Sequence, residues 1–265
     1  MRVVTYLSAA EVDPARVAGG TAVVIDVIRA TSTLTEALAN GARAIYPTGT
    51  TEQAIHLANS LGREDTLLCG ERKGLKVEGF DLGNSPGEFE RSRVEGKSLV
   101  MSTTNGTRAF LAAAGARRVL AGSFLNLAAV AARVDAEEDD FLVVVCAGKE
   151  GRFSLDDALC AGHLIRSLEE RGWEEMDLDD GSRASLALAR EGEATPELLA
   201  ETEAGRALVE VGLENDLELC AEVDRHRIVP EMRDRVIRVD PPSASGASEE
   251  GETRTAPREG PEANG

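Results

Sequence analysis

The chain has 265 residues, with 47 acidic against 29 basic side chains and a formal net charge of −18. This length is enough for one large or two small domains with a sizeable core. So acidic a chain lacks the basic face that a nucleic acid or an anionic membrane surface requires, and we expect neither as a partner. A small anionic substrate stays compatible with this charge, because a few local cations are enough to line one cleft.

The cysteines and the apolar segments set further limits. The four cysteines form no C-x-x-C pair, which disfavours a zinc ribbon and favours free buried thiols in a reducing compartment. The N-terminal segment has no apolar stretch long enough for a signal peptide, and the longest apolar run, 141–147, is far too short to cross a bilayer. We therefore expect a cytoplasmic protein with no membrane partner.

Apolar runs alternate with helical patterns along the first 170 residues. Strands are predicted at 3–7, 22–27, 44–47, 66–69, 98–102, 118–121 and 141–146. Helices are predicted at 31–40, 51–61, 104–114, 125–134 and 155–170. Continuous apolar strands such as TAVVIDV are typical of a sheet that is covered on both faces. The alternation predicts an α/β protein, a three-layer α/β/α sandwich around a mostly parallel, mixed sheet.

The pattern changes after about residue 175. Helices rich in Ala, Glu and Arg are predicted at 181–191 and 196–211, and a last strand is predicted at 235–239. From Asp240 on, the chain is made of Pro, Gly, Ser and charged residues without an aromatic, and so cannot bury enough apolar surface to become ordered. We therefore predict a single domain over residues 1–240 and a disordered acidic tail over 241–265.

Polar or small side chains follow five of the predicted strands. They are Asp26 and Arg29, then Glu71, then the segment 102–107, then Ser123 and Asn126, and finally Gly148, Lys149 and Gly151. In an open parallel sheet, ligands bind at the carboxyl ends of the strands. One such cluster is explained by helix capping alone, whereas five together predict a shared cleft.

The segment 70–86, GERKGLKVEGFDLGNSP, has neither a helical nor a strand period. It holds two acidic residues, Glu71 and Asp81, and three cations, Arg72, Lys73 and Lys76. A long irregular segment within a compact domain is usually functional. Its composition predicts an anionic, phosphorylated ligand held near a metal, and the alternative is a solvated surface loop.

The segment 102–107, STTNGT, also has two interpretations. Ser102 or Thr103 can cap a helix, and Asn105-Gly106 can form a turn. The exposed N–H groups at a helix start can equally hold phosphate. Neither a Walker motif nor a dinucleotide-binding G-x-G-x-x-G accompanies it.

Two motifs in the sequence could supply a nucleophile, one with a serine and one with a cysteine. Residues 83–87, GNSPG, match the G-x-S-x-G of serine hydrolases, but Pro86 has no N–H to donate to an oxyanion, so this chemistry fails. Residues 146–152, CAGKEGR, have the Cys-x5-Arg spacing of cysteine-dependent phosphatases, although Val145 stands where a His is usual. Cys146 is thus either a nucleophile or a buried thiol at a strand end.

Carboxylates offer a third chemistry. The available hard ligands are Asp26, Glu71, Asp81, Asp156 and Asp157. Mg²⁺ takes one or two carboxylates together with water and substrate phosphate, neutralises phosphoryl charge and orients the attacking group. Ile28 occupies the place of the second Asp of a haloacid-dehalogenase motif. Arg29 would supply bidentate contacts to phosphate or sulfonate.

Taken together, several of these segments resemble the 2-phosphosulfolactate phosphatase family. They are DVIRATST (26–33), the segment 70–86, STTNGT (102–107), GSFLN (122–126), CAGKEGRFSLDDALCAG (146–162) and the late 228–230. The resemblance runs in order over roughly residues 3–239. It implies an α/β/α fold and a Mg²⁺-dependent phosphatase that converts 2-phospho-3-sulfolactate to sulfolactate and phosphate, a step towards coenzyme M in methanogens.

The motifs and the strand ends together give the predicted site. As catalytic residues we predict Asp26, Arg29, Asp157 and Cys146. As metal ligands we predict Asp26, Glu71 and Asp81. As substrate-binding residues we predict Arg72, Lys76, Asn84, Ser85, Thr103, Thr104, Asn105, Ser123 and Asn126. The sequence does not decide which carboxylate attacks and which only binds metal.

Three hypotheses follow. The first is a Mg²⁺-dependent phosphomonoesterase, and the second keeps the substrate but uses Cys146 as nucleophile. The third is a non-catalytic anion-binding protein, against which the acidic residues count, because carboxylates repel an anion unless a metal lies between them. A homo-oligomer is the ordinary expectation for such enzymes.

Overall fold

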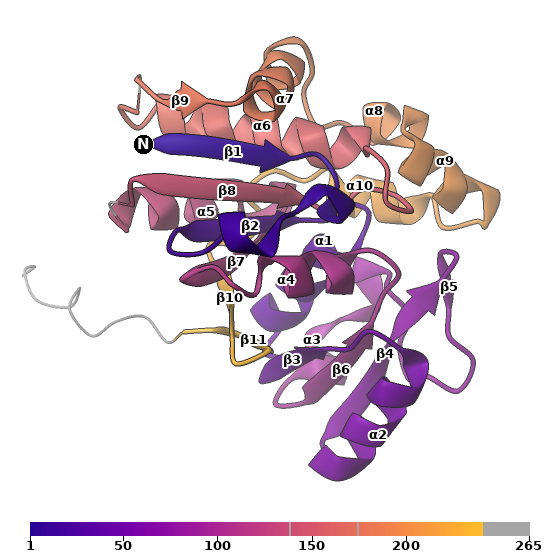
Figure 1. Ribbon diagram of the computed structural model, residues 1–265. Coiled ribbons are helices and arrows are strands. Elements are labelled where there is room, and N and C mark those ends of the chain that lie inside the picture. Colours follow the sequence, from indigo (N-terminus) through magenta and orange to yellow (C-terminus); the bar gives the residue numbers. More distant parts are fainter. Residues whose placement is uncertain (138, 174, 241–265) are drawn as a thin grey trace, which may run out of the picture.

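The computed structural model describes residues 1–137, 139–173 and 175–240, and the predicted tail, 241–265, lies outside the described residues. The described part is built on one 11-stranded sheet with helices packed around it (Figure 1). The strands are β1 (Arg2–Tyr6), β2 (Thr21–Ile25), β3 (Ala44–Pro47), β4 (Thr66–Arg72), β5 (Leu75–Lys76), β6 (Ser98–Ser102), β7 (Arg118–Gly122), β8 (Phe141–Cys146), β9 (Asp177–Leu178), β10 (Pro230–Arg233) and β11 (Val236–Val239).

The helices through α7 lie at the predicted positions, except for the short helix at Arg91–Val94, which the sequence did not predict. They are α1 (Ala30–Ala39), α2 (Thr51–Leu61), α3 (Arg91–Val94), α4 (Gly106–Ala113), α5 (Leu127–Ala136), α6 (Leu155–Glu169), α7 (Asp180–Glu191), α8 (Pro196–Glu201), α9 (Glu203–Glu210) and α10 (Asn215–Cys220). The single helix predicted at 196–211 is two helices. The break comes at Thr202, whose extended backbone ends α8 and whose hydroxyl accepts a hydrogen bond from Gly205 N to cap α9.

Strand β2 shows why the sheet is covered on both faces. Its residues are all buried, and they alternate between two apolar clusters. Val23 and Ile25 belong to the cluster that contains residues of α5 and α6, whereas Ala22 and Val24 belong to the cluster of α1 and α4. Because successive side chains of a strand point to opposite faces, helices lie on both sides. The predicted α/β fold with a mostly parallel, mixed sheet is confirmed.

The strand order is β5-β4-β6-β3-β11-β10-β7-β2-β8-β1-β9. Two groups of parallel strands, β4-β6-β3 and β7-β2-β8-β1-β9, are therefore joined by the antiparallel hairpin β10-β11. The joints are short, because β10 pairs with β7 at two positions and β11 pairs with β3 only at Ile237 and Ile45. The sequence predicted only one strand in this hairpin and missed β5 and β9, which have two residues each.

The two groups of strands meet again at their carboxyl ends. Helix α4, which follows β6 of the first group, packs against β2 and β8 of the second. A Cβ atom at Gly106 would lie 2.5 Å from Ala30 Cβ and 2.8 Å from Asp26 Oδ2, so only glycine permits this approach. The close packing brings residues after β6 next to residues after β2, although four strands separate these two in the sheet.

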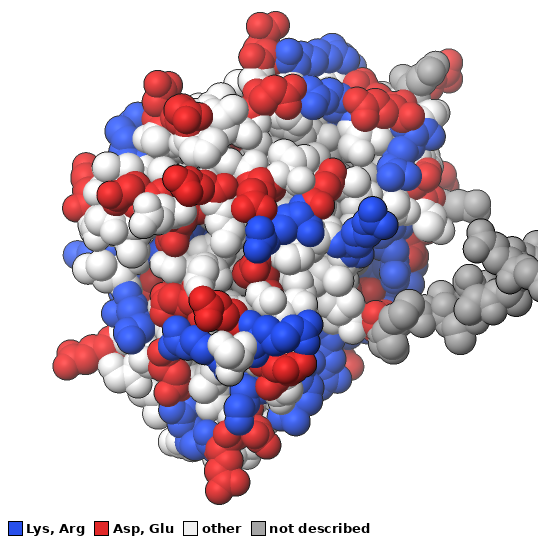
Figure 2. All heavy atoms as spheres, turned by 180° about the vertical axis from the view of Figure 1, so that it is seen from behind, with Lys and Arg blue, Asp and Glu red and all other residues white. Residues whose placement is uncertain are grey.

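Charged residues of both signs lie on the surface. On the face shown in Figure 2, acidic and basic side chains are intermixed. All four cysteines are buried and free, as predicted. Within the described ranges, no helix combines the length and the apolar character needed to cross a membrane.

Candidate active site

A cavity of about 580 Å³ lies at the carboxyl ends of β2, β4, β6 and β8. Its polar lining includes Asp26, Arg29, Glu71, Arg72, Lys73, Asn84, Thr103, Thr104, Asn105, Lys149, Glu150, Ser154, Asp156 and Asp157. Residues of α9 and Val211 form an additional, largely apolar part of the wall. Four of the five polar strand ends therefore share a cleft, as predicted, whereas Ser123 and Asn126 after β7 do not line it. Nine of the predicted site residues line the cavity.

Asp26 is held directly after β2 by its own segment. Its N–H donates to Thr31 Oγ1 (2.9 Å), and the Thr31 hydroxyl donates to the Asp26 carbonyl oxygen (2.8 Å). Asp26 Oδ1 accepts a hydrogen bond from Ala30 N (3.2 Å), the first residue of α1. In the described part of the chain no hydrogen bond reaches Asp26 Oδ2. That oxygen is consequently available to a ligand.

Three buried carboxyl groups oppose each other's ionisation. Burial raises the pKa of Asp26 to about 7, and the charges of Asp156 and Glu71 raise it as well. Burial also raises the pKa of Asp156, and burial together with Asp156 and Asp26 raises the pKa of Asp157 well above its ordinary value. Like charges in a desolvated site cannot all ionise unless a cation compensates them. Without a cation, at least one of these three carboxyl groups therefore keeps its proton.

Asp157 connects two strand ends. Its Oδ1 accepts a hydrogen bond from Val27 N and its Oδ2 accepts one from Gly148 N, both at 2.9 Å. These two amides follow β2 and β8, respectively, so the carboxylate fixes the two loops relative to each other. Both oxygens are thus occupied by the backbone, which gives Asp157 a positioning function.

Glu71 connects two other segments in the same way. Its Oε1 accepts from Thr104 N (2.8 Å), and its Oε2 accepts from Gly74 N (2.9 Å). The first amide precedes α4 and the second lies in the β4-β5 turn. A buried carboxylate satisfied by two N–H groups is an effective anchor, and here it ties both segments to the cavity wall.

Arg29 is almost fully buried and points its guanidinium towards several acceptors. One Nη donates to Asp216 Oδ2 (2.7 Å) and to Ser85 Oγ (3.0 Å), and the other donates to the carbonyl oxygen of Gly74 (2.6 Å). A guanidinium has more N–H groups than these three acceptors use, so Arg29 keeps donors for a ligand. Asp216, on α10, was missed because that helix carries no recognisable motif.

The first turns of three helices contribute to the cavity. Arg29, Asn105 and Ser154 precede α1, α4 and α6, and all three line it. Free N–H groups and the helix dipole favour an anion at a helix start. The cavity therefore combines buried carboxylates with positive helix ends, a balance that suits a cation and an anionic group together.

Two cavity atoms lack the partners that buried polar atoms normally have. Asn84 Oδ1 and Thr104 Oγ1 are buried and accept or donate no hydrogen bond within the protein as described. Like Asp26 Oδ2, these are hard oxygen donors at the cavity, the kind of ligand that Mg²⁺ prefers. The described residues contain no group of three acidic, His or Cys side chains close enough to hold a metal. Mg²⁺ needs fewer, because water and substrate phosphate complete its coordination, so the donor set fits.

Residues 6–235 match the family model described as 2-phosphosulpholactate phosphatase. The chain belongs to this family. A protein of Clostridium acetobutylicum named probable 2-phosphosulfolactate phosphatase is 38% identical over 231 residues, covering 87% of this chain and 97% of that protein. Proteins of the same name from Caldanaerobacter subterraneus (41% identical, 82% and 89% covered) and Thermotoga maritima (40% identical, 80% and 88% covered) are also similar. The predicted family, and with it the class of phosphoric monoester hydrolases, is confirmed.

Not every predicted residue of this phosphatase-family site lies at the cavity. Asp81 binds Leu68 N (2.7 Å) and forms an ion pair with Arg63 (3.0 Å), and it does not line the cavity. Lys76 is exposed on β5. Ser85 reaches the cavity only indirectly, through its hydrogen bonds to Arg29 and Asp216.

Two further predicted residues have structural partners. The Ser123 N–H donates to Asn126 Oδ1 at the start of the 3₁₀ helix η4 (Phe124–Asn126), and the Asn126 amide donates to the carbonyl oxygens of Ala121 and Ile228. Both side chains are completely buried. The polar residues after β7 are therefore explained by helix capping, the alternative to ligand binding that the sequence pattern allowed.

Cys146 lies in the apolar core below the cavity, and its arrangement opposes a nucleophilic function. Burial, followed by the charge of Asp157, raises the pKa of the Cys146 thiol well above its ordinary value. Arg152, which a cysteine-dependent phosphatase would need beside the thiol, is exposed and paired with Glu203 at 2.8 Å. A protonated thiol without an arginine is a poor nucleophile.

Some cavity residues were not in the predicted set. They are Lys73, Lys149, Glu150, Asp156 and the α9 residues Ala204, Ala207 and Leu208. Asp156 carried a signal, since it stands beside Asp157 in the first turn of α6. The α9 residues carried none, because an amphipathic helix after the α/β region does not reveal where it packs.

Proposed function

We propose that this protein is a Mg²⁺-dependent phosphatase that hydrolyses 2-phospho-3-sulfolactate to 3-sulfolactate and phosphate in the cytoplasm. The observation that carries the metal dependence is the open Oδ2 of Asp26, together with the unpaired oxygens of Asn84 and Thr104. The substrate is supported by the family and by the names of the similar proteins.

Asp26, Asn84 and Thr104 would hold the Mg²⁺. When bound, the ion neutralises phosphoryl charge and orients the reacting groups. It would also favour ionised carboxylates at the cavity, because a nearby cation lowers the pKa of an acid. Asp157 and Glu71 keep the surrounding loops in place through their backbone hydrogen bonds.

The phosphoryl group is bound by the protein's own donors. Arg29 contributes the N–H groups that its protein partners leave unused, the start of α4 contributes backbone N–H groups, and the dipoles of α1 and α4 favour the anion. Asp156, whose pKa is raised by burial, is placed to accept the proton of an attacking water. The water oxygen bonds to phosphorus, the P–O ester bond breaks, and the proton passes to the leaving C2 oxygen.

The apolar wall favours the same reaction. Ala204, Leu208 and Val211 lie along one side of the cavity and offer no hydrogen bonds from their side chains. Excluding water from this side strengthens the electrostatic interactions on the other. The arrangement therefore supports a small, highly charged substrate that is enclosed from one side.

The decisive experiment measures phosphate release from 2-phosphosulfolactate, with Mg²⁺ and then with excess EDTA. Phospholactate, phosphoglycolate and p-nitrophenyl phosphate serve as comparison substrates. We expect turnover that requires the metal and prefers phosphosulfolactate. Full activity in EDTA would contradict the metal dependence, and saturable binding without phosphate release would favour the non-catalytic anion-binding alternative.

A second measurement does not depend on turnover. Mg²⁺ should raise the melting temperature of the wild-type protein, because a ligand that binds only the folded state stabilises it. The Asp26→Asn variant should show a much smaller shift at the same concentration. Equal shifts in both proteins would contradict the assignment of Asp26 as a metal ligand.

A further inference from the structure

Lys73 occupies the tip of a hairpin that forms one wall of the cavity. Strands β4 and β5 pair Glu71 with Lys76 and Arg72 with Leu75, which leaves Lys73-Gly74 as a two-residue turn. Both turn residues have positive φ, 53° and 82°, as a type I′ turn requires. Lysine is an unusual choice here, since Asn, Asp or Gly adopt this conformation more readily.

The backbone of this tip is fixed at the cavity while the Lys73 side chain is free to move. Gly74 O accepts a hydrogen bond from Arg29 (2.6 Å), and Gly74 N donates to Glu71 (2.9 Å). A Cβ atom at Gly74 would also contact Val211 and Leu208 at 3.7 and 3.8 Å, so the turn packs closely on the apolar wall. The exposed ammonium group therefore stays near the cavity mouth.

The other cations of the cavity already have protein partners. Arg29 binds Asp216, and Arg72 donates to Ser102 Oγ (2.9 Å) and to backbone oxygens. Lys149 Nζ donates to the carbonyl oxygen of Glu203 (2.7 Å). Among the lining residues that the structure describes, Lys73 is the cation whose side chain has neither a hydrogen bond nor an ion pair.

We propose that Lys73 binds the sulfonate of the substrate and so sets the preference for phosphorylated acids that carry this second strong acid. The inference rests on the proposed function. The phosphoryl group belongs at the buried end, beside Asp26. The carboxylate is attached to the same carbon atom, C2, as the phosphate ester. The sulfonate lies one carbon further away, towards the mouth. There it would meet Glu150 and Glu210, so it needs an unpaired cation.

The same hairpin supplies a matched control. Lys76, which the sequence favoured, is also exposed and lies three residues from Lys73, but it does not line the cavity. Substituting either lysine changes the net charge of the hairpin equally. A general electrostatic effect on substrate binding should therefore be the same for both substitutions. Only the substitution of Lys73 should weaken binding further.

The experiment compares Lys73→Asn, which keeps the turn conformation, with Lys76→Asn. We expect Lys73→Asn to lower kcat/KM for 2-phosphosulfolactate by about tenfold, mainly through KM, as the loss of one charge-assisted contact predicts. The value for 2-phospholactate, which has no sulfonate, should remain unchanged, and Lys73→Arg should keep most of the preference. An equal loss on both substrates, or an equal loss in Lys76→Asn, overturns the proposal.

Binding measurements separate this proposal from the proposed function. Titration with 3-sulfolactate and with inorganic phosphate needs no turnover. Lys73→Asn should weaken sulfolactate binding by about tenfold and leave phosphate binding unchanged. If Lys73→Asn differs from the wild type in this way but the wild type releases no phosphate, the phosphatase function fails and the Lys73 site stands. If the wild type binds no sulfolactate, the Lys73 site is wrong.

Discussion

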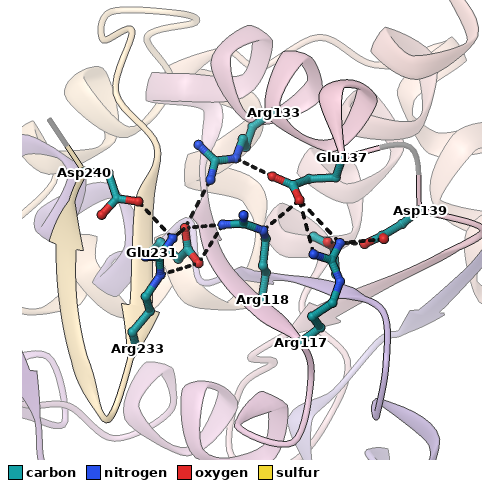
Figure 3. A network of polar contacts seen from close by, with 9 residues as sticks. Arg117, Arg118, Arg133, Glu137, Asp139, Glu231, Arg233 and Asp240 are labelled. Atoms are coloured by element: carbon teal, nitrogen blue, oxygen red, sulfur yellow. Dashed lines mark hydrogen bonds and ion pairs between the residues drawn. The ribbon is translucent and has the colours of Figure 1, made fainter. Parts of the chain in front are cut away.

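Two dense groups of charged side chains lie at opposite edges of the sheet, one at the carboxyl and one at the amino ends of parallel strands. One is the cavity, at the carboxyl ends. The other lies at the amino end of β7 and consists of Arg117, Arg118, Arg133, Glu137, Asp139, Glu231, Arg233 and Asp240 (Figure 3). In this second network Arg118 bridges Glu137 (2.7 Å) and Glu231 (2.9 Å). It connects β10 to β7 and to the end of α5, and so secures the hairpin that joins the two groups of strands.

The pKa values of buried carboxyl groups are shifted in opposite directions in the two groups. Burial raises the pKa of Glu231, but the hydrogen bond from Arg233 and the charges of Arg118 and Arg133 outweigh it, and the pKa lies below its ordinary value. In the cavity, burial raises the pKa of Asp26 to about 7, and the charge of Arg29 does not offset it. A buried carboxyl group therefore has a lowered pKa where arginines surround it, as at Glu231, and a raised pKa where burial outweighs the nearby positive charge, as at Asp26.

The largest effect is expected from Asp26→Asn. Turnover should fall by about a thousandfold, because the variant loses the open carboxylate oxygen. In EDTA at pH 8 the variant should be more stable than the wild type by about 2 kcal/mol, since a buried, uncompensated charge has been removed. Phosphate release and urea unfolding measure the two effects. A variant that is inactive but also less stable would contradict this account of Asp26.

The pH dependence of stability tests the same difference without a mutation. An unfolded Asp loses its proton near pH 4, whereas Asp26 in the folded protein keeps its proton up to about pH 7. Folding therefore retains a proton in this window, and the free energy of unfolding should fall as the pH rises from 4 to 7 and then level off. The decline should be shallower in Asp26→Asn. Urea unfolding in EDTA across this range provides the measurement.

In the ion-pair network, Glu231→Gln should lower the stability of the protein, whereas Asp26→Asn raises it in the cavity. Loss of this buried charge leaves three arginines facing one another, so the free energy of unfolding should fall by about 2 kcal/mol. Because the network is far from the reacting groups, kcat/KM should stay near the wild-type value. Glu95→Gln, which breaks an exposed pair with Arg91, is the control and should have no measurable effect. A large loss of turnover with unchanged stability would contradict the division between the two groups.

Asp216→Asn should have a smaller effect, confined to the cavity. Asp216 accepts hydrogen bonds from Arg29 (2.7 Å) and Ser85 (2.8 Å), so the substitution should loosen the guanidinium and lower kcat/KM by about tenfold. The melting temperature should also fall, because the buried guanidinium of Arg29 loses its charged partner. Glu218→Gln, exposed on the same helix, serves as the control. Unchanged kinetic constants would show that Arg29 does not depend on Asp216.

The smallest effect is expected from Cys146→Ser. The thiol is buried and its pKa is raised, so the hydroxyl should leave kcat within about a factor of three and cost about 1 kcal/mol of stability. Phosphate release under Mg²⁺ measures the first and thermal unfolding the second. Complete loss of turnover in a folded variant would restore Cys146 as the nucleophile.

The sequence alone determined most of the longer elements and the edge of the sheet at which the cavity lies. Buried strands such as β2 and β8 are continuous apolar runs, and parallel strands put the residues that follow them at one edge of the sheet. Asp26, Glu71 and Thr104 could therefore be assigned to a common cleft, whereas Asn84 and Asp157 entered the predicted site through the family resemblance. Local pattern was sufficient here, because burial and strand direction are set by residues close together in the chain.

Only the tertiary structure decided what each of these residues can do. Asp157 and Glu71 have both oxygens occupied by amides from other segments, whereas Asp26 keeps one open. Lys73 and Lys76 look alike in sequence, yet the hairpin turn brings only Lys73 to the cavity. Contacts of this kind depend on residues far apart in the chain, such as Asp216 and Arg29. Whether a charge is paired or free is consequently fixed by the fold and has no signature in the local sequence.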